Sequence, residues 1–382
     1  MKIVIAPDSF KESLSALQVA AAIEAGLREV LPDADIVKVP VADGGEGTVQ
    51  ALVDATGGRR VPARVTGPLG LPADAFYGVT GDGVAVIEMA AASGLEMVAP
   101  DRRDPRITTS RGTGELILHA LDQGSRRFVL GVGGSATNDG GAGMLQALGV
   151  RLLDIDGIEL GPGGGALAGL ARIDASKLDP RIGESSFQIA CDVDNPLTGP
   201  RGASAIFGPQ KGATPAMVEQ LDANLARYGR IVAHERGQDH AAVAGAGAGG
   251  GIALAMLAYL GGRLRPGVEI VTEAVGLADA VRGADLVITG EGRIDGQTVN
   301  GKTPMGVARV AAAQGVPVIG IGGCLAPDAY RVHVHGIEAV FAAVNRPCTV
   351  AEALAAGEAN LRSAARNVAA ALRLGMSLGG AR

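Results

Sequence analysis

The sequence is poor in aromatic residues and has no tryptophan. Aromatic residues make up 3% of the 382 residues, whereas apolar residues of all kinds make up 47%. Aliphatic side chains must therefore fill the interior, and they are abundant enough to form sizeable cores. Because a chain of this length exceeds what one hydrophobic core usually supports, we expect two domains.

Cysteine and net positive charge are also scarce. The three cysteines, Cys191, Cys324 and Cys348, are far apart and form no C-x-x-C pair. This spacing argues against a disulfide framework or a zinc site, and it fits the reducing cytoplasm. The net charge of −6 argues against a nucleic-acid partner, which would need a basic face and usually stacking aromatics.

The chain has little that resembles a membrane or export segment. Residues 241–262 carry no charge and are long enough to span a bilayer, but seven of them are glycine. Their strongly apolar part begins only at Ile252. We therefore expect a glycine loop followed by a buried helix, with a membrane span as the alternative. The apolar stretch in the opening MKIVIAPDSF is too short for a signal peptide.

Glycine, in contrast, is abundant. The 59 glycines are about twice the usual share of a globular protein. They follow no collagen-like period and cluster in short runs instead. Because glycine has no Cβ, such clusters mark places where the main chain can approach a ligand closely.

Hydrophobic periodicity predicts alternating strands and helices near both ends of the chain. The expected strands are residues 2–6, 35–39, 285–289, 316–321 and 338–342, and the expected helices are 16–30, 47–55, 304–313 and 350–373. This alternation predicts a parallel sheet covered by helices. The middle of the chain differs, with hairpin-like strands at 75–79 and 84–89 and helices at 113–123, 215–235 and 252–260.

These patterns predict an α/β protein with two α/β domains. The first is a Rossmann-like, three-layer domain whose parallel sheet is built from both chain ends, residues 1–66 and 285–382. The second is a mixed α/β domain, residues 67–284, inserted in the first. A cleft between domains is the default place for a ligand.

Charged residues follow the first two expected strands. Asp8 and Lys11 lie in the segment APDSFKESLS, and Asp43 and Glu46 lie in ADGGEG. In open α/β sheets, ligands bind at the carboxyl ends of strands. Lys11 is suited to hold a carboxylate or a phosphoryl group, with Asp8 orienting it. The alternative is simple capping by Asp8 and Ser9, with Lys11 in solvent.

Residues 128–143, FVLGVGGSATNDGGAG, run from an apolar strand into glycines and hydrogen-bonding side chains. Exposed backbone N–H groups at such a turn can cradle an anion. The alternative is a tight turn rich in capping residues. We predict nucleotide contacts here from Gly133, Gly134, Ser135, Thr137, Asn138 and Asp139.

The same segment also fits a dinucleotide-binding pattern. Gly131, Gly133 and Ala136 match G-x-G-x-x-A, and Asp154 lies about where a ribose-binding acid would be. An NAD-dependent dehydrogenase of a small hydroxy acid is therefore an alternative function. The pattern is weak in so glycine-rich a chain, because residues 245–250 match G-x-G-x-x-G as well.

Residues 289–303, TGEGRIDGQTVNGKT, combine glycines with charges of both signs. Residues 296–303 fit the P-loop string, but the expected strand ends several residues too early for a P-loop. Carboxylates suit Mg²⁺ and a cation suits phosphate, so this loop is suited to a Mg²⁺-nucleotide. The alternative is a surface loop with its own salt bridge. The residues that we assign are Gly290, Glu291, Gly292 and Lys302 for the nucleotide and Asp295 for the metal.

Residues 190–200, ACDVDNPLTGP, place Asp192 and Asp194 after an apolar strand. One of them could accept the proton of a substrate hydroxyl or bind a metal. The alternative is a turn, since D-x-D-N-P is also turn chemistry. His333 and His335 lie on an expected strand with no third ligand in view, so no metal site is expected there.

The whole chain resembles the type-1 family of bacterial glycerate kinases. The resemblance runs through APDSFKESLSA, VADGGEGT, TTSRGTGELI, GVGGSATNDGGAGMLQALG, CDVDNPLTGPRGASAIFGPQKGA and DLVITGEGRIDGQTVNGK. It implies ATP-dependent phosphorylation of D-glycerate and two α/β domains, the second inserted in the first. Bacterial members mostly resemble makers of 2-phosphoglycerate.

The sequence departs from the family pattern at three positions of interest. Glu12 stands where the family often has glycine, Arg111 replaces a frequent aromatic residue, and Gly296 replaces a frequent serine. Arg111 adds a cation that is suited to an anionic substrate. The glycine at 296 makes the match to the P-loop string look accidental.

The resemblance and the motifs together give a predicted site. Lys11 and Arg111 hold the glycerate carboxylate, and Asp8 or Asp192 accepts the hydroxyl proton. Asp192 is also predicted to bind the metal with Asp295. Further substrate contacts are assigned to Ser9, Phe10 and Asp43. A non-catalytic binder of small anions is a further alternative, and the oligomeric state is left open, with a homodimer as one alternative.

Overall fold

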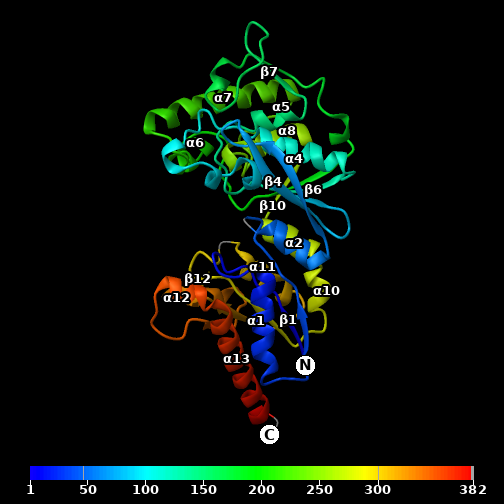
Figure 1. The fold of residues 1–382 in the computed structure, drawn as a ribbon, viewed down its shortest axis with the longest axis vertical. Coiled ribbons are helices and arrows are strands. Elements are labelled where there is room, and N and C mark those ends of the chain that lie inside the picture. The colour runs from blue at the N-terminus through cyan, green and yellow to red at the C-terminus, as the bar shows by residue number, and fades with distance from the viewer. Residues whose placement is uncertain (46, 300, 380–382) are drawn as a thin grey trace. The chain divides into compact units, whose positions relative to one another are not determined.

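The computed structural model describes residues 1–45, 47–299 and 301–379. The chain divides into two compact units, which Figure 1 colours by residue number. Unit 1 consists of Met1–Asp43, Gln50–Thr56 and Val268–Arg382, and unit 2 of Gly44–Val49 and Gly57–Gly267. Unit 1 therefore joins the beginning of the chain, in blue, to its end, in orange and red.

Unit 1 contains a five-stranded sheet in which every pair of neighbouring strands is parallel. Its strands, in spatial order, are β15 (Ala339–Ala342), β13 (Val318–Gly322), β11 (Leu286–Thr289), β1 (Lys2–Ile5) and β2 (Asp35–Lys38). The first strand of the chain pairs directly with β11, 283 residues later. The prediction of a parallel sheet built from both chain ends is thereby confirmed.

Two helices from opposite ends of the chain pack side by side on this sheet (Figure 1). They are α1 (Ala16–Arg28) and α13 (Gly357–Gly379), and α1 begins at the expected N-cap, Ser15, in a capping box. A Cβ on Gly26 would lie 2.2 Å from the carbonyl oxygen of Arg362, so only glycine allows this approach. Ile3 and Ile5 of β1 point into the same core as α1 and α13.

Val4 of β1 and Val287 of β11 are also fully buried, although they point to the opposite face of the sheet. Both faces are therefore covered, as a three-layer α/β arrangement requires. The remaining helices with residues in unit 1 are α2 (Thr48–Thr56), α9 (Gly267–Ala274), α10 (Leu277–Val281), α11 (Thr303–Ala312) and α12 (Val350–Ala355). Two short parallel strands, β12 (Arg293–Ile294) and β14 (Cys324–Leu325), pair with each other.

Two predicted elements of unit 1 differ from the structure. Residues 350–373 do not form one helix, because α12 ends before α13 begins at Gly357. The hydroxyl of Ser13 donates to the carbonyl oxygen of Leu354 at 2.7 Å, and Gly357 packs so close to Ser13 that a Cβ would lie 2.4 Å from its Oγ. The predicted strand at His333 and His335 is also wrong, since both residues lie in a 3₁₀ helix, Ala329–His335.

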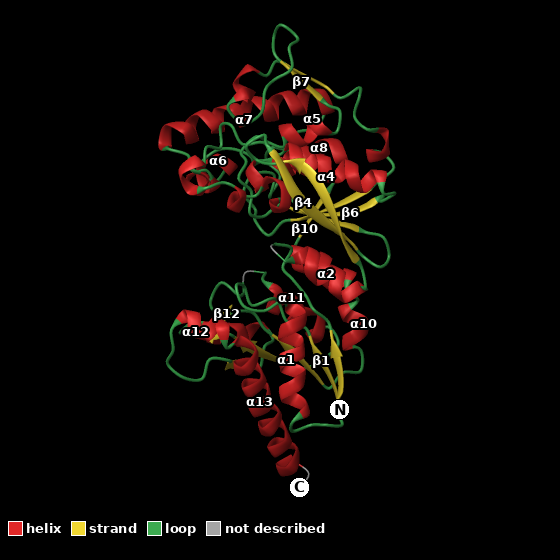
Figure 2. Cartoon of the chain, in the orientation of Figure 1, coloured by secondary structure: helices red, strands yellow, loops and turns green. Residues whose placement is uncertain are grey.

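Unit 2 contains a six-stranded mixed sheet (Figure 2). Its order is β10 (Arg263–Arg265), β9 (Ser186–Ala190), β6 (Arg127–Gly131), β5 (Ala85–Glu88), β4 (Pro72–Val79) and β3 (Arg59–Thr66). The first four strands are parallel and the last two are antiparallel to their neighbours. We had expected residues 59–66 in the first domain. In the structure β3 pairs along its whole length with β4, from Arg59–Val79 to Thr66–Pro72, and so joins the second sheet.

The helices of unit 2 surround a large apolar core. They are α3 (Ala90–Ser93), α4 (Arg111–Asp122), α5 (Ala142–Ala147), α6 (Ala203–Phe207), α7 (Pro215–Arg236) and α8 (Ile252–Leu260). A two-stranded antiparallel sheet pairs β7 (Arg151–Leu153) with β8 (Arg172–Asp174). The rings of Phe128 and Phe187 stack in the core with centroids 4.7 Å apart. The uncharged segment ends in the buried helix α8, as expected. Among the described residues, no helix is both long and apolar enough to cross a bilayer.

Candidate active site

Unit 1 contains a cavity of about 570 Å³ at the carboxyl ends of its parallel strands. The loops that follow β1, β11, β13 and β15 all contribute to its wall. Ligands of open α/β sheets bind at this edge. Among the predicted site residues, the cavity gathers Asp8, Ser9, Phe10, Lys11, Asp43, Glu291, Gly292, Asp295 and Lys302.

The loop after β1 is held close to the loop after β11. The backbone N–H of Asp8 donates to the carbonyl oxygen of Gly290 at 2.8 Å. Residues 10–14 then form a tight turn in which Phe10 and Leu14 exchange backbone hydrogen bonds. Within this turn Glu12 has φ +62°, and it is the single non-glycine residue with positive φ in the described part of the chain. The family preference for glycine at this position therefore has a conformational reason.

Asp8 lies at the polar end of the cavity, where its carboxylate is already hydrogen-bonded. It accepts hydrogen bonds from the backbone N–H of Ser9 at 2.6 Å, from the hydroxyl of Ser9 and from the hydroxyl of Thr303. Burial, together with the nearby charge of Asp43, nevertheless raises the pKa of Asp8 to about 7. A carboxylate with a pKa near the operating pH is suited to accept a proton.

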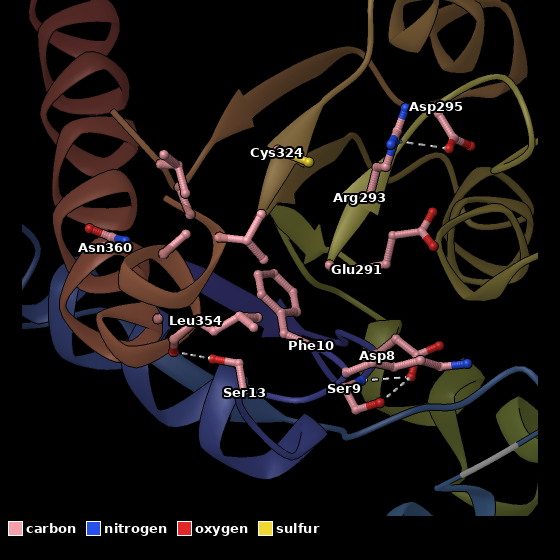
Figure 3. A pocket seen from close by; sticks show the side chains of 18 of the residues that line it. Asp8, Ser9, Phe10, Ser13, Glu291, Arg293, Asp295, Cys324, Leu354 and Asn360 are labelled. Atoms are coloured by element: carbon pink, nitrogen blue, oxygen red, sulfur yellow. Dashed lines mark hydrogen bonds and ion pairs between the residues drawn. The ribbon is translucent and has the colours of Figure 1, made fainter. Parts of the chain in front are cut away.

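Glu291 follows β11 and is 9% exposed. Its carboxylate accepts hydrogen bonds from the hydroxyl of Thr298 at 2.6 Å and from the ammonium of Lys302 at 3.2 Å. Burial raises the pKa of Glu291, while Thr298 and Lys302 oppose that rise. The loop after β11 therefore contains a salt bridge between Glu291 and Lys302, as the alternative of a self-contained surface loop predicted. The same loop also lines the cavity (Figure 3).

Glycines bring the loops of this edge together. A Cβ on Gly290 would lie 2.1 Å from the carbonyl oxygen of Ile321, and a Cβ on Gly323 would lie 2.4 Å from the carbonyl oxygen of Gly292. Side chains at these positions would push apart the ends of β11 and β13. The bare main chain of Gly292 and Gly323 consequently forms part of the cavity wall.

Asp295 lies in the same wall and pairs with Arg293 at 3.3 Å. The described residues contain no group of three or more His, Cys, Asp or Glu side chains arranged to hold a metal ion. Mg²⁺ in kinases is commonly held by one or two carboxylates together with the phosphates of the substrate. The donor set at this end of the cavity fits that second mode, and Asp295 as a metal ligand stays a prediction.

The match of residues 296–303 to a P-loop is not supported. Helix α11 does begin at Thr303, but the strand before the loop is the two-residue β12. The ammonium of Lys302 pairs with Glu291, and a Cβ on Gly296 would lie 2.3 Å from a carboxylate oxygen of Asp328. A side chain at 296 would therefore require the carboxylate of Asp328 to move.

In unit 2, the predicted nucleotide loop after β6 is mostly interior. Gly133 and Gly134 are exposed, whereas Ser135 is 6% exposed and Thr137 and Asn138 are fully buried. The loop is held by Lys211, which is itself 2% exposed and which the sequence analysis did not select. Its ammonium donates to Ser135 Oγ at 2.7 Å and to the carbonyl oxygen of Thr137 at 2.6 Å. The contacts of this loop with a nucleotide stay a prediction.

Burial lowers the pKa of Lys211 to about 7, an effect that the charge of Asp139 opposes. The motif FGPQKG at 207–212 was the available signal for this lysine. A sequence does not show that a lysine side chain points into a core, because lysine is usually exposed.

Asp139 is fully buried and organises the turn before α5. Its carboxylate accepts hydrogen bonds from the N–H and hydroxyl of Ser110, at 2.9 and 2.8 Å, and from the N–H groups of Gly141 and Gly143. Burial raises the pKa of Asp139 although these bonds oppose it. In the structure Asp139 therefore acts as a capping residue of this turn, as the alternative interpretation of the sequence expected.

The other predicted residues of unit 2 are exposed. Asp192 lies beyond the end of β9 and accepts a hydrogen bond from the N–H of Gly267 at 3.0 Å. Asp194 pairs with Arg201 at 2.7 Å. Arg111 is the first residue of α4 and pairs with Glu115 at 3.0 Å. Strand β9 ends at Ala190, so the two aspartates are not on a regular strand.

The dinucleotide pattern lacks its structural context. Ten residues separate β6 from α5, which is only six residues long, whereas the pattern requires a helix directly after the strand. Asp154 caps a local turn by accepting from the N–H groups of Asp156 and Ile158. Residues 245–250 follow no strand directly. Glu46, which the sequence analysis noted beside Asp43, lies outside the described residues.

Comparison with known proteins adds an independent finding. The profile of the Glycerate kinase family matches residues 3–373. The chain is 56% identical to a glycerate kinase of Bacillus subtilis (strain 168), covering 99% of both chains. It is also 56% identical to a glycerate 2-kinase of Escherichia coli (strain K12), covering 98% of this chain and 99% of the relative.

A solved structure from Salmonella typhimurium LT2, described as a glycerate kinase 2, has the same fold. Its TM-score is 0.92 at 57% identity, and the match covers 99% of both chains. The α/β fold that the sequence predicted is confirmed by this likeness, and so is the resemblance on which the predicted site partly rests.

Proposed function

The chain belongs to the glycerate kinase family, and from this premise we propose that it transfers the γ-phosphoryl group of ATP to a hydroxyl of D-glycerate. The favoured product is 2-phosphoglycerate, because one relative at 56% identity is named a glycerate 2-kinase. The observation that carries the proposal is the cavity at the strand ends of unit 1, which brings the half-buried Asp8 together with cations and bare main chain.

Asp8 is the proposed acceptor of the hydroxyl proton. Its pKa of about 7 leaves it substantially ionised at neutral pH yet basic enough to take a proton. The hydroxyls of Ser9 and Thr303 donate to its carboxylate and hold the side chain in one orientation. Asp192 is the alternative base, but it is exposed and unit 2 supplies it.

The remaining roles follow from charge. Lys11, exposed at the tip of the first loop, is suited to bind the glycerate carboxylate. Gly292 lets phosphate oxygens approach backbone N–H groups, and Lys302 is the nearby cation of that loop. Gly290 stays assigned to the nucleotide on the sequence motif alone. Since the transition state of phosphoryl transfer is loose and highly charged, positioning and charge stabilisation should supply most of the rate enhancement.

We also propose that the nucleotide binds as its Mg²⁺ complex. It would neutralise charge on the phosphates, and Asp295 at the cavity and Asp192 in unit 2 are the carboxylates assigned to it. Contacts of Arg111 and of residues 133–139 with substrate or nucleotide are proposed on the sequence motifs alone.

A coupled assay of ADP release tests the function. Wild-type protein with Mg·ATP should release ADP on addition of D-glycerate, and NMR of the product should locate the phosphate on one hydroxyl. No ADP release across a panel of small hydroxy acids would leave a non-catalytic binder of anions. The dehydrogenase alternative predicts a change of nicotinamide absorbance with glycerate, which we do not expect.

Two further expectations belong with this proposal. A cytoplasmic location is supported by three free cysteines, which suit a reducing compartment. The oligomeric state, with a homodimer as one alternative, stays a prediction that sedimentation can test.

A further inference from the structure

The cavity of unit 1 is larger and less polar than glycerate requires. It reaches across the ends of four adjacent strands, β1, β11, β13 and β15. Neighbouring strands lie about 4.8 Å apart, so the first and fourth are separated by roughly 14 Å. Glycerate has only three carbons and no apolar group, and it can occupy one part of this space only.

The two ends of the cavity differ in chemistry. Asp8, Asp43, Glu291, Asp295 and the three cations Lys11, Arg293 and Lys302 lie at the end near β1 and β11. The end near β15 and α12 is lined by Val344, Cys348, Val350, Ala353 and Leu354. Figure 3 shows Phe10 between Asp8 and Glu291 on one side and Leu354 and Asn360 on the other.

Ser13 and Thr349 also line the apolar end, but their hydroxyls donate to Leu354 and Glu352, which leaves Asn360 as the polar side chain of interest. Asn360 lines the cavity from the first turns of α13. Its backbone N–H bonds the carbonyl oxygen of Ala356, but its side-chain amide has no hydrogen-bond partner within the described part of the chain. An amide offers one donor group and one acceptor, which is the pair that the edge of a purine base can satisfy.

We propose that the apolar end of this cavity binds the nucleobase of the phosphoryl donor, with the amide of Asn360 reading the edge of the base. The proposal rests on the proposed kinase function and deepens it. An apolar slot with one convergent polar group is the usual form of a small-molecule subsite. The base is the flat, apolar part of ATP, and the glycine main chain of Gly292 then lies between it and Asp8.

This orientation accounts for the order of groups along the strand ends. The acceptor occupies the end near β1, where Asp8 takes the proton. The triphosphate crosses the end of β11, where the main chain of Gly292 and the side chain of Lys302 line the cavity. The base reaches β15 and α12, which the acceptor does not need. Ser13 fixes α12 through its hydrogen bond to Leu354, so the slot has a rigid wall.

Thiol protection tests the subsite without using activity. Cys324 and Cys348 line the cavity, whereas Cys191 belongs to unit 2 and is an internal control. Wild-type protein is treated with N-ethylmaleimide, and alkylation of each cysteine is followed by mass spectrometry. Adenosine, which carries no phosphate, should slow alkylation of Cys348 several-fold and leave Cys191 unchanged.

Matched variants of α12 test it by kinetics. Ala353→Trp fills the apolar end and should raise the KM for ATP by about tenfold or more, with the KM for glycerate within about twofold. Ala355→Trp adds the same side chain at an exposed position of the same helix that does not line the cavity. It should leave both constants unchanged. An equal rise of both KM values in Ala353→Trp would contradict the subsite.

Asn360→Asp tests whether the side chain at 360 forms hydrogen bonds with the edge of the base. This variant also tests the subsite if Ala353→Trp does not fold. A carboxylate can only accept hydrogen bonds, and guanine offers two adjacent N–H donors where adenine offers one group. The ratio of kcat/KM for GTP over ATP should therefore rise, by about tenfold. Ala359→Asp, at the exposed neighbouring position of α13, should not change the ratio.

The outcomes separate this proposal from the function on which it rests. If wild-type protein phosphorylates glycerate from ATP but adenosine protects neither Cys324 nor Cys348, the base binds elsewhere and the subsite is overturned. The same conclusion follows if Asn360→Asp leaves the GTP-to-ATP ratio unchanged. If ATP-dependent phosphorylation is absent altogether, the proposed function fails, whatever the thiols show.

Discussion

Two glycine-rich loops of this chain follow apolar strands, yet they differ in what surrounds their charges. After β11, Glu291 and Lys302 pair at the wall of an open cavity. After β6, Asp139 and Lys211 are buried in the core of unit 2, and each is hydrogen-bonded to protein groups instead of to the other. Both loops are rich in glycine, but the carboxylate of Glu291 lines a cavity whereas that of Asp139 is enclosed in the core.

This difference shows that glycine runs mark close packing of main chain before they mark a ligand. Gly290 is required because the ends of two strands meet there, and Gly250 of unit 2 is required for the same kind of reason, since a Cβ would lie 1.9 Å from the carbonyl oxygen of Thr137. Whether a ligand can reach such main chain depends on what covers it. Of these two glycine-rich loops, the one after β11 lines the cavity of unit 1 and the one after β6 does not.

The largest expected effect contrasts the two candidate bases, one from each unit. Asp8→Asn should lower kcat by about 10²–10⁴-fold, because it removes the proton acceptor. Asp192→Asn should lower it much less, since this side chain is exposed and accepts the N–H of Gly267. Both variants should fold, as circular dichroism can check. The reverse order of the two effects would assign the base to Asp192.

Next in size is the loss of the buried carboxylate of unit 2. Asp139→Asn should lower the free energy of unfolding by about 3 kcal/mol, because the amide cannot accept all the hydrogen bonds that Ser110, Gly141 and Gly143 donate. Glu291→Gln is the matched change in the other loop. It should cost less, about 1 kcal/mol, because the amide oxygen can still accept the hydrogen bond of Thr298. Urea unfolding followed by circular dichroism measures the free energy of unfolding of both variants. Equal losses would contradict the difference between the two loops.

The burial of Lys211 in unit 2 should make the free energy of unfolding depend on pH. Because its folded pKa is lowered to about 7 from 10.5, the unfolded chain binds more protons between these values, and stability rises with pH across that window. Relative to Lys211→Met, the wild type should therefore gain up to about 1.4 kcal/mol of unfolding free energy per pH unit above pH 7. Urea titrations at pH 7, 8 and 9 measure it, and a constant difference would contradict the lowered pKa of Lys211.

The charge of Asp43 should influence the pH dependence of catalysis in the cavity of unit 1. The charge of Asp43 helps to raise the pKa of Asp8, so Asp43→Asn should move the acidic limb of the kcat/KM profile from about pH 7 to lower pH. Activity falls as pH falls through this limb because Asp8 takes up a proton. Asp74→Asn, an exposed residue of β4 in unit 2, serves as a control that should not move the limb.

The smallest expected effect concerns the strained turn after β1. Glu12 has φ +62°, which costs a residue with a Cβ about 1–2 kcal/mol. Glu12→Gly relieves that strain but gives the unfolded chain more freedom, so the net stabilisation should be under about 1 kcal/mol. Glu12→Ala keeps the Cβ and should change little. Thermal unfolding of the two variants compares them, and destabilisation by glycine would show that the turn is not strained.

Much of the fold could be predicted from the sequence, because it rests on local patterns. The strands at 2–6 and 285–289 and the helix after Ser15 all appear within a few residues of their expected bounds. The break between α12 and α13 could not be predicted. It depends on Ser13, more than 340 residues away, which bonds Leu354 and packs against Gly357.

The candidate site was predicted unevenly for a similar reason. Asp8, Asp43 and Glu291 were found because each follows a strand, and parallel strands end at one edge. Thr303, Asn360 and Lys211 were missed. They act through partners that are distant in the sequence, such as the carboxylate of Asp8 for Thr303 and the carbonyl oxygen of Thr137 for Lys211.

The sequence by itself determined the α/β class, the parallel strands at both ends of the chain and the family, because periodicity and long ordered motifs are local properties. Only the tertiary structure decided which charges are buried, how the pKa of Asp8 and that of Lys211 are shifted, and which glycine loop lines a cavity. Those properties depend on the removal of water by residues that are far apart along the chain, and no stretch of sequence contains that information.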